Sequence, residues 1–184
     1  MVEVVVMMAI IVTISGMVLV SFTGLHEGTA LNRAARELAL AIRKVQNTSL
    51  AVTQVDTRAG PKIPPAVGIR LTQGTRVFIL FADLTRDNKY DPSVPSEDPD
   101  ARIGDEQIFE GGVKVKSLAA IDVLGNPQIA AGAHIIFAAP EAAVFIADQD
   151  GIALGDTLKI ELASASGRVT KTVTVRTSGQ VSIR

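Results

Sequence analysis

Cysteine and tryptophan are both absent from the 184 residues of this chain. Without cysteine, the protein forms no disulfide and offers no thiol nucleophile or cysteine-ligated zinc or iron–sulfur site. A single tyrosine beside six phenylalanines supplies few of the stacking surfaces that single-stranded nucleic acid requires. The formal net charge of -1 excludes a broad electrostatic attraction to nucleic acid or to membrane surfaces. Contacts with such partners would therefore depend on local patches.

Recognisable catalytic motifs are missing as well. His26 and His134 are the only histidines, and neither stands at a catalytic or metal-binding spacing from a serine or a second histidine. The sequence contains no G-x-S-x-G, H-E-x-x-H, Walker or dinucleotide-binding pattern. We therefore expect that the protein is not an enzyme, and that His134 forms a cap or pairs within a strand.

The N-terminal end is strongly apolar. Glu3 is the only ionisable side chain before residue 26, and residues 4–22 form a nearly continuous apolar run. A helix over these residues would cover about 29 Å, close to the ~30 Å hydrocarbon core of a bilayer. A cleaved signal peptide would be shorter and preceded by basic residues. A buried core helix would need most of the remaining chain to cover it. We therefore expect residues 1–25 to form a transmembrane or filament-core helix.

A second helical pattern continues directly from the first. Arg33, Arg36 and Arg43 take other faces than the apolar and small side chains, which recur in steps of four and three. This periodicity predicts an amphipathic continuation of the helix over residues 26–55, with one face packed on a domain. The recurring positions are Leu31, Ala35, Leu38, Ile42, Val45, Ser49 and Val52.

The remaining residues, 56–184, predict a globular antiparallel β-domain. Residues 56–65 include three prolines and are the expected linker. Short apolar or alternating runs follow, separated by glycine-containing turns. The expected fold class is therefore α+β, with a long N-terminal helix packed on a C-terminal antiparallel β-sheet domain. The expected strands are 67–72, 77–82, 107–110, 113–118, 134–138, 143–147, 157–163, 169–177 and 181–184, with the last three forming a meander.

Glu3 requires a partner if it enters an apolar environment. A carboxylate in hydrocarbon costs ~2.5 kcal/mol or more unless it is paired, and no basic side chain lies near it in the sequence. The candidate partner is an α-amino group, either its own or that of an identical neighbouring chain. The alternative is a solvated Glu3 at the level of the lipid headgroups.

The N-terminal residues M-V-E-V-V-V-M-M-A-I-I resemble the start of mature type IV pilins and of the pseudopilins of type II secretion. Aligning Glu3 with the glutamate of that family also aligns Ala9, Ile10 and Ile11. The C-terminal runs resemble the H-type, FimT-like pseudopilins, although Gln180 follows Gly179 where that branch has arginine. The resemblance implies that Glu3 acts in assembly, and that a prepilin peptidase processes and methylates the N-terminus.

The function that this resemblance implies is that of a structural subunit in an extracellular type IV pilus-like filament. The expected partners are identical subunits in a helical homopolymer, the inner membrane before assembly, and the prepilin peptidase and pilus assembly machinery. One alternative is a minor pilin or pseudopilin of a type II secretion or DNA-uptake machine, which primes assembly or binds a ligand such as DNA. Another is a monomeric membrane-anchored binding protein.

Basic residues outnumber acidic ones in the last three expected strands. Glu161 is the only acidic residue from Thr157 to the C-terminus. Such a patch suits phosphates or the acidic loop of the next subunit. Nucleic acid is the less expected partner, because aromatic side chains are not interleaved with the basic ones. The candidate contact residues are Lys159, Arg168, Lys171, Arg176 and Arg184.

An EF-hand-like spacing marks residues 83–91, D-L-T-R-D-N-K-Y-D. Oxygen-bearing side chains stand at relative positions 1, 3, 5 and 9, which suits the 6 to 8 oxygen ligands of Ca²⁺. Asn88 replaces the usual glycine, and Val94 replaces the usual glutamate, for which Asp98 or Asp100 could also substitute. Calcium is the expected cofactor, and a solvated acidic loop is the alternative. The expected ligands are Asp83, Thr85, Asp87, Lys89 (through its carbonyl), Asp91, Asp105 and Glu106.

Overall fold

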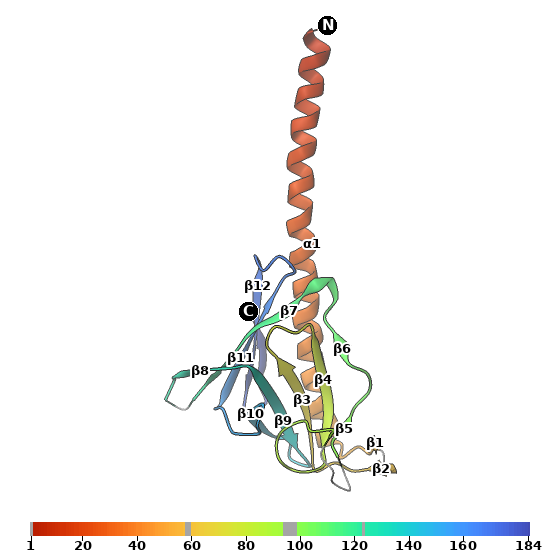
Figure 1. Ribbon diagram of the computed structural model, residues 1–184, viewed down its shortest axis with the longest axis vertical. Helices are drawn as coiled ribbons and strands as arrows, with labels where there is room; N and C mark the ends of the chain where they lie inside the picture. Colours follow the sequence, from red (N-terminus) through yellow and green to blue (C-terminus); the bar gives the residue numbers. More distant parts are fainter. Residues whose placement is uncertain (1, 58–59, 94–98, 123) are drawn as a thin grey trace.

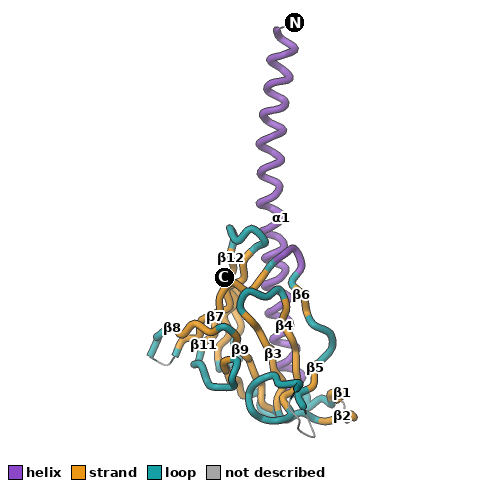
Figure 2. The backbone as a smooth tube through the Cα atoms, in the orientation of Figure 1, coloured by secondary structure: helices purple, strands orange, loops and turns teal. Residues whose placement is uncertain are grey.

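A single long helix, α1 (Val2–Leu50), projects from a β-rich body in the computed structural model (Figures 1 and 2). The structure describes residues 2–57, 60–93, 99–122 and 124–184, apart from the side chains of residues 18–25. The N-terminal half of α1 stands clear of the body, and the C-terminal half lies along it. Within these described residues, no helix combines the length and the apolar content that crossing a membrane requires. The predicted segment 1–25 includes Met1 and the side chains of residues 18–25, which the structure does not describe.

The strands form three antiparallel sheets, so the predicted fold class needs correction. The protein is β-rich, and its helix does not pack on one sheet alone. The sequence could not reveal this division, because alternation along a strand shows that one face is buried but not which sheet the strand joins. A short 3-10 turn, η1 (Glu110–Gly112), connects two of the sheets.

The largest sheet has the order β10-β9-β3-β4-β5, and β6 also pairs with β4. A second sheet has the order β13-β12-β11-β7-β8, and a two-stranded sheet joins β1 to β2. The predicted C-terminal meander is confirmed as β11-β12-β13. The strands are β1 (Val55–Thr57), β2 (Gly60–Lys62), β3 (Ala66–Thr72), β4 (Val77–Asp83), β5 (Ala101–Arg102), β6 (Gln107–Ile108), β7 (Lys114–Ile121), β8 (Pro127–Ala130), β9 (Gly132–Ala138), β10 (Ala143–Asp148), β11 (Thr157–Ala163), β12 (Thr170–Arg176) and β13 (Val181–Ile183).

The predicted linker, residues 56–65, also needs correction. Thr57 pairs with Gly60, and β1 and β2 occupy half of this segment. Gly60 has φ of 107°, a conformation that glycine adopts without a steric penalty. The three prolines of this segment suggested an unpaired connection, but Pro61 pairs with Asp56, because both strands of a two-stranded sheet are edge strands and these accommodate proline.

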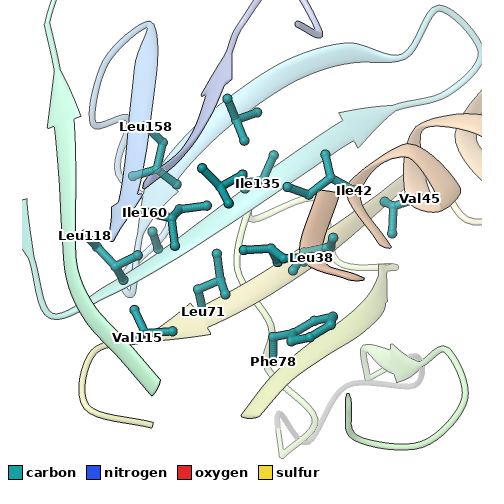
Figure 3. Close-up of a cluster of buried hydrophobic side chains, with 14 of the residues drawn as sticks. Leu38, Ile42, Val45, Leu71, Phe78, Val115, Leu118, Ile135, Leu158 and Ile160 are labelled. Carbon is teal, nitrogen blue, oxygen red and sulfur yellow. The ribbon is translucent and has the colours of Figure 1, made fainter. Parts of the chain in front are cut away.

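One face of α1 fills the space between the two larger sheets (Figure 3). Leu38, Ile42 and Val45 of the helix pack in one cluster with side chains from both sheets, and each is at most 1% exposed. Ser49 fixes the end of the helix, because its hydroxyl donates a hydrogen bond of 3.0 Å to the Phe137 carbonyl of β9. The sheet residues shown with them are Leu71, Phe78, Ile135, Val115, Leu118, Leu158 and Ile160.

Two turns contact α1 where it leaves the body, and we call them the collar: η1 and the hairpin between β11 and β12. The backbone of Gly111 in η1 comes so close to Ala30 that a Cβ on Gly111 would lie 2.6 Å from the Ala30 Cβ. Arg33 forms a 2.8 Å ion pair with Glu110 of the same turn. The hairpin between β11 and β12 reaches the helix from another side, where Ser166 donates a hydrogen bond to Glu27. Residues before Glu27 therefore form the projecting half of α1.

The buried face of α1 generates a stability prediction. Ile42→Ala should lower the free energy of unfolding by about 2–5 kcal/mol, because the deletion leaves a cavity between the helix and two sheets. Urea titration of the detergent-solubilised chain, followed by circular dichroism, measures the change. Leu40→Ala is the matched control, since Leu40 is 64% exposed on the same helix, and its effect should stay within about 0.5 kcal/mol. Equal losses in both variants would contradict the packing described.

Candidate functional site

The loop that follows β4 folds back over the outer face of the largest sheet. Tyr90 in this loop packs on Phe81 of β4, with ring centroids 5.3 Å apart. Phe81 belongs to a small second cluster on that face, together with Ala66 and Ile136. Gly68 makes room for it, because a Cβ at that position would lie 2.6 Å from the Phe81 ring. The aromatic contact anchors the loop and brings its carboxylates to the sheet.

Asp83 organises the first part of the loop. Its carboxylate accepts hydrogen bonds from the backbone N–H groups of Arg86 at 2.6 Å and Asn88 at 3.1 Å. Both donors have positive φ, 63° for Arg86 and 62° for Asn88. Asparagine visits this left-handed region more readily than most residues. Asn88 therefore takes the sharp turn that the EF-hand-like pattern assigns to glycine.

Asp100 closes the same loop from the far end. One of its oxygens accepts a 2.9 Å hydrogen bond from Leu84 N–H, and the other accepts a 2.9 Å hydrogen bond from Asp91 N–H. The Thr85 hydroxyl donates to Asp100, and its oxygen lies 3.4 Å from carboxylate oxygens of both Asp83 and Asp100. Asp83 and Asp100 thus both accept hydrogen bonds from backbone N–H groups between Leu84 and Asp91, and both carboxylates lie beside the Thr85 hydroxyl.

Burial perturbs both carboxylates. Asp83 is 0% exposed and Asp100 is 5% exposed. Desolvation raises the pKa of Asp83 above its usual value, and the neighbouring charge of Asp87 adds to the increase. Desolvation also raises the pKa of Asp100, with a further contribution from the charge of Asp83. Backbone hydrogen bonds lower both pKa values but do not reverse the change.

His134 of β9 supports the loop from the sheet. Its Nε2 accepts a 3.3 Å hydrogen bond from Tyr90 N–H, so the proton lies on Nδ1, which donates to the Asp148 carbonyl at 2.7 Å. Desolvation lowers the pKa of His134 and favours this neutral form. On the neighbouring turn, Gly151 has φ of 85°, and a Cβ there would collide with the Asp87 carbonyl oxygen.

Three carboxylates converge in this loop. Oxygen atoms of Asp83, Asp87 and Asp100 all lie within 4.8 Å of one another. The donor set consists only of oxygens and carries high negative charge, which suits a hard cation such as Ca²⁺. The carboxylates retain acceptor capacity, because each oxygen has two lone pairs. The described residues therefore fit a divalent cation at this point.

The structure brings together only part of the predicted ligand set. Asp83, Thr85 and Asp87 meet as the spacing predicts, and Asp100 joins them from beyond the nine-residue pattern. Asp91 lies outside the cluster, and Lys89 Nζ is 3.7 Å from carboxylate oxygens of both Asp91 and Asp87. Asp105 and Glu106 are not in the cluster, and Glu106 pairs with Arg102 at 3.1 Å. The alternative Asp98 and the position-12 residue Val94 lie outside the described residues.

The projecting half of α1 is a second candidate site. Eleven large apolar side chains between Val2 and Met17 are 51% to 78% exposed. Glu3 lies in the first turn of the helix and is exposed, and Met1 is outside the described residues. An exposed apolar surface of this extent marks a surface that another molecule covers.

The candidate contact residues of the C-terminal strands do not form one patch. Register places Lys159 and Arg176 on the same outer face of the sheet, and Arg184 joins them opposite Thr172. Lys171 lies opposite Leu162 and therefore on the other face. Arg168 belongs to the hairpin turn between β11 and β12. Lys116 and Glu161 form a 2.9 Å ion pair within the outer face.

No family model, curated protein or solved structure matches this chain. The arguments about function therefore rest on the residues and their geometry.

The raised pKa values of Asp83 and Asp100 generate a prediction for the metal-free protein. A folded state that favours protonated carboxylates binds more protons than the unfolded state, so these groups add stability as pH falls. Their contribution should grow as pH falls from 7 through the raised pKa values and be complete below the unfolded value of 3.8. Urea unfolding in chelator, compared between wild type and Asp100→Asn, should show a wild-type advantage that increases on acidification.

Asp122→Asn is the control for this experiment. The backbone hydrogen bond from Asn126 lowers the pKa of Asp122, so its contribution is present above pH 3.8 and is lost below it. The difference between wild type and Asp122→Asn should stay flat from pH 7 to about pH 5. A wild-type advantage over Asp100→Asn that decreases on acidification would contradict the burial described for the cluster.

Proposed function

We propose that this protein is a structural subunit of an extracellular helical filament, and that it assembles through the projecting half of α1. The observation that carries the proposal is the exposed apolar surface from Val2 to Met17. The body of the same chain buries its apolar side chains between two sheets and the other half of the helix. The projecting half has no such cover within the described part of the chain, so its cover comes from other molecules.

The distribution of the apolar side chains favours several neighbours over one. Val4, Val5, Val6 and Met7 are all exposed and apolar, and consecutive helical residues point about 100° apart. A two-stranded coiled coil needs only one apolar stripe. A helix that is apolar all round is covered only by a ring of neighbours, as in a bundle of parallel helices at the centre of a filament.

Burial of this surface supplies the driving force. Each large apolar side chain that is fully buried contributes on the order of 1.5–3 kcal/mol, and eleven such side chains are exposed here. The loss of translational and rotational freedom and the ordering of side chains oppose association. Burial of apolar surface is thus a driving force for assembly that needs no covalent link, which suits a chain without cysteine.

Glu3 is the proposed assembly residue within this bundle. Its carboxylate would be desolvated among apolar side chains, and a desolvated carboxylate requires a cation. The N-terminal amine of a neighbouring parallel copy is the group that an array of such helices would bring to this level. The resemblance of residues 1–11 to type IV pilins and pseudopilins supports the same assignment.

The runner-up is a minor pilin or pseudopilin of a secretion or DNA-uptake machine. Lys159, Arg176 and Arg184 share one sheet face, which favours a contact with an anionic partner. The proposal ranks this second, because Glu161 and its ion pair with Lys116 interrupt the face and Lys171 lies on the opposite side.

Calcium forms a second part of the proposal. The Asp83–Asp87–Asp100 cluster would hold the ion, with the Thr85 hydroxyl beside it. The ion would neutralise three converging carboxylates and stabilise the loop over the outer face of the sheet, a role suited to a protein that works outside the cell. Extracellular calcium sites typically bind at ~0.1–1 mM.

Assembly of the full chain tests the filament proposal. When detergent is removed from the solubilised wild type, filaments should appear in electron micrographs and in the pellet after centrifugation. Ile11→Lys should reduce the pelleted fraction at least about tenfold, because the bundle would bury an unpaired ammonium group. Glu3→Ala should also reduce it, since the interchain ion pair would be lost.

Ile129→Lys is the matched control for Ile11→Lys. Ile129 is also an exposed isoleucine, but it lies on the edge strand β8 of the body. Its replacement should leave the pelleted fraction unchanged. A wild-type chain that stays monomeric after detergent removal would overturn the filament proposal, and equal losses in both variants would move the contact away from α1.

Calcium binding is tested through thermal stability. At pH 7, 1–5 mM Ca²⁺ should raise the melting temperature of the wild type, because a ligand that binds only the folded state stabilises it. Asp87→Ala should abolish this response. Asp150→Ala, which removes an exposed carboxylate outside the cluster, should retain it. A wild-type melting temperature that is the same in chelator and in calcium would sink the calcium proposal.

A further inference from the structure

The solvent side of α1 carries a basic stripe within its body half. The stripe consists of Arg36, Leu40, Arg43 and Lys44, which follow at helical steps of four, three and one and lie on the exposed side of the helix. Leu40 is 64% exposed although it lies on the part of α1 that packs against the body. Shallow hollows of about 600, 560 and 360 Å³ lie along this side, and Leu40 lines all three.

The described part of the chain provides no ion-pair partner for the charges of the stripe. Among the described residues, Arg36, Arg43 and Lys44 form no ion pair, whereas Arg33 one turn earlier is paired with Glu110. Three cations and one half-buried carboxylate, Glu37, lie around the exposed Leu40, so the surface is net positive and its counterpart would be acidic at its rim and apolar at its centre.

The same chain carries a surface with that composition. Ile108 of β6 is 57% exposed, and the exposed carboxylates Asp105 and Glu106 precede it. We call residues 105, 106 and 108 the acidic edge. Nine acidic and three basic residues lie between Asp83 and Glu110, so the edge belongs to the most negative segment of the chain. The ion pair of Glu106 with Arg102 is exposed, and such pairs exchange partners at little cost.

We propose that the basic stripe of one copy binds the acidic edge of a second copy, with Ile108 of one chain packed on Leu40 of the other. This inference rests on the proposed filament and specifies a contact between the bodies of neighbouring subunits. Asp105 and Glu106 would lie against Arg36 and Arg43, so that the opposite charges surround the apolar contact. Charge complementarity is the argument for a second copy as the occupant.

In the proposed filament the contact is heterologous, because the stripe and the acidic edge of each copy meet different neighbours. A copy that uses its stripe for one neighbour keeps its acidic edge for the next, so the contact repeats along an open assembly instead of closing a pair. The projecting halves of α1 would form the centre of that assembly, and the stripe and edge would set the position of each body around it.

Chemical cross-linking tests the contact, because a chain without cysteine accepts single engineered thiols without background. Leu40→Cys and Ile108→Cys are prepared as separate full-length variants, mixed in equal amounts, assembled by detergent removal and treated with a short bismaleimide. We expect a dimer band in the mixture and little in either variant alone. Separate variants exclude a link within one chain.

The mixture of Leu40→Cys with Ile129→Cys is the matched control. It should give little dimer, because Ile129 lies on β8, on the opposite side of the body from β6 and the acidic edge (Figure 1). Filaments without the 40–108 link, or with an equally strong 40–129 link, would overturn this inference and leave the filament proposal standing. Absence of filaments in the wild type would overturn both. A chain carrying both thiols should give a ladder, and a product that stops at the dimer would contradict the repeating contact.

Charge reversal is the second measurement. Arg36→Glu with Arg43→Glu should raise the concentration needed for assembly about tenfold, and Asp105→Lys with Glu106→Lys should do the same. All four substitutions together should restore most of the wild-type value. Failure of restoration in chains that fold normally by circular dichroism would overturn the pairing. Binding of a DNA duplex at ~150 mM salt that is lost in Arg36→Glu with Arg43→Glu would assign the stripe to nucleic acid instead.

Discussion

The burial of one face of α1 between two sheets is the constraint on which the rest of this structure depends. Neither sheet could cover its inner face alone, because both contribute side chains to a single core around Leu38 and Ile42. The helix is thus the shared third layer of the body. Since it is continuous from Val2 to Leu50, the packing that holds the body together also determines where the apolar half emerges and how far it extends.

Much of the strand content follows from the sequence. Alternation and turn residues predict nine of the eleven strands from β3 onwards and also the C-terminal meander, but they miss the short strands β5 and β8. The division into three sheets does not follow, because a pattern of alternate burial is the same whichever sheet covers it. The pairing of β1 with β2 could not be predicted either, because the glycine and proline residues of this segment are typical of unpaired connections.

The candidate metal site could likewise be predicted only in part from the sequence. The spacing of Asp83, Thr85 and Asp87 is local, and the sequence predicts their convergence. Asp100 depends on the path of the chain after the loop, and the sequence offered it only as one of several alternatives. The support from His134 is a contact across 44 residues. No short pattern encodes such a contact, which depends on the pairing of β9 with β3 and β3 with β4.

The position of the helix also has a mechanical consequence. If neighbouring subunits hold the projecting half, tension enters each body along the axis of α1. The buried residues from Leu31 to Val45 lie in a row along that axis, so they would have to slide past both sheets together, instead of separating one after another. The Ser49 hydrogen bond to β9 and the collar at Gly111 lie at the two ends of that row. In a body built in this way, tension along α1 acts as shear on all the packed residues at once, and resistance to that tension requires no covalent cross-link.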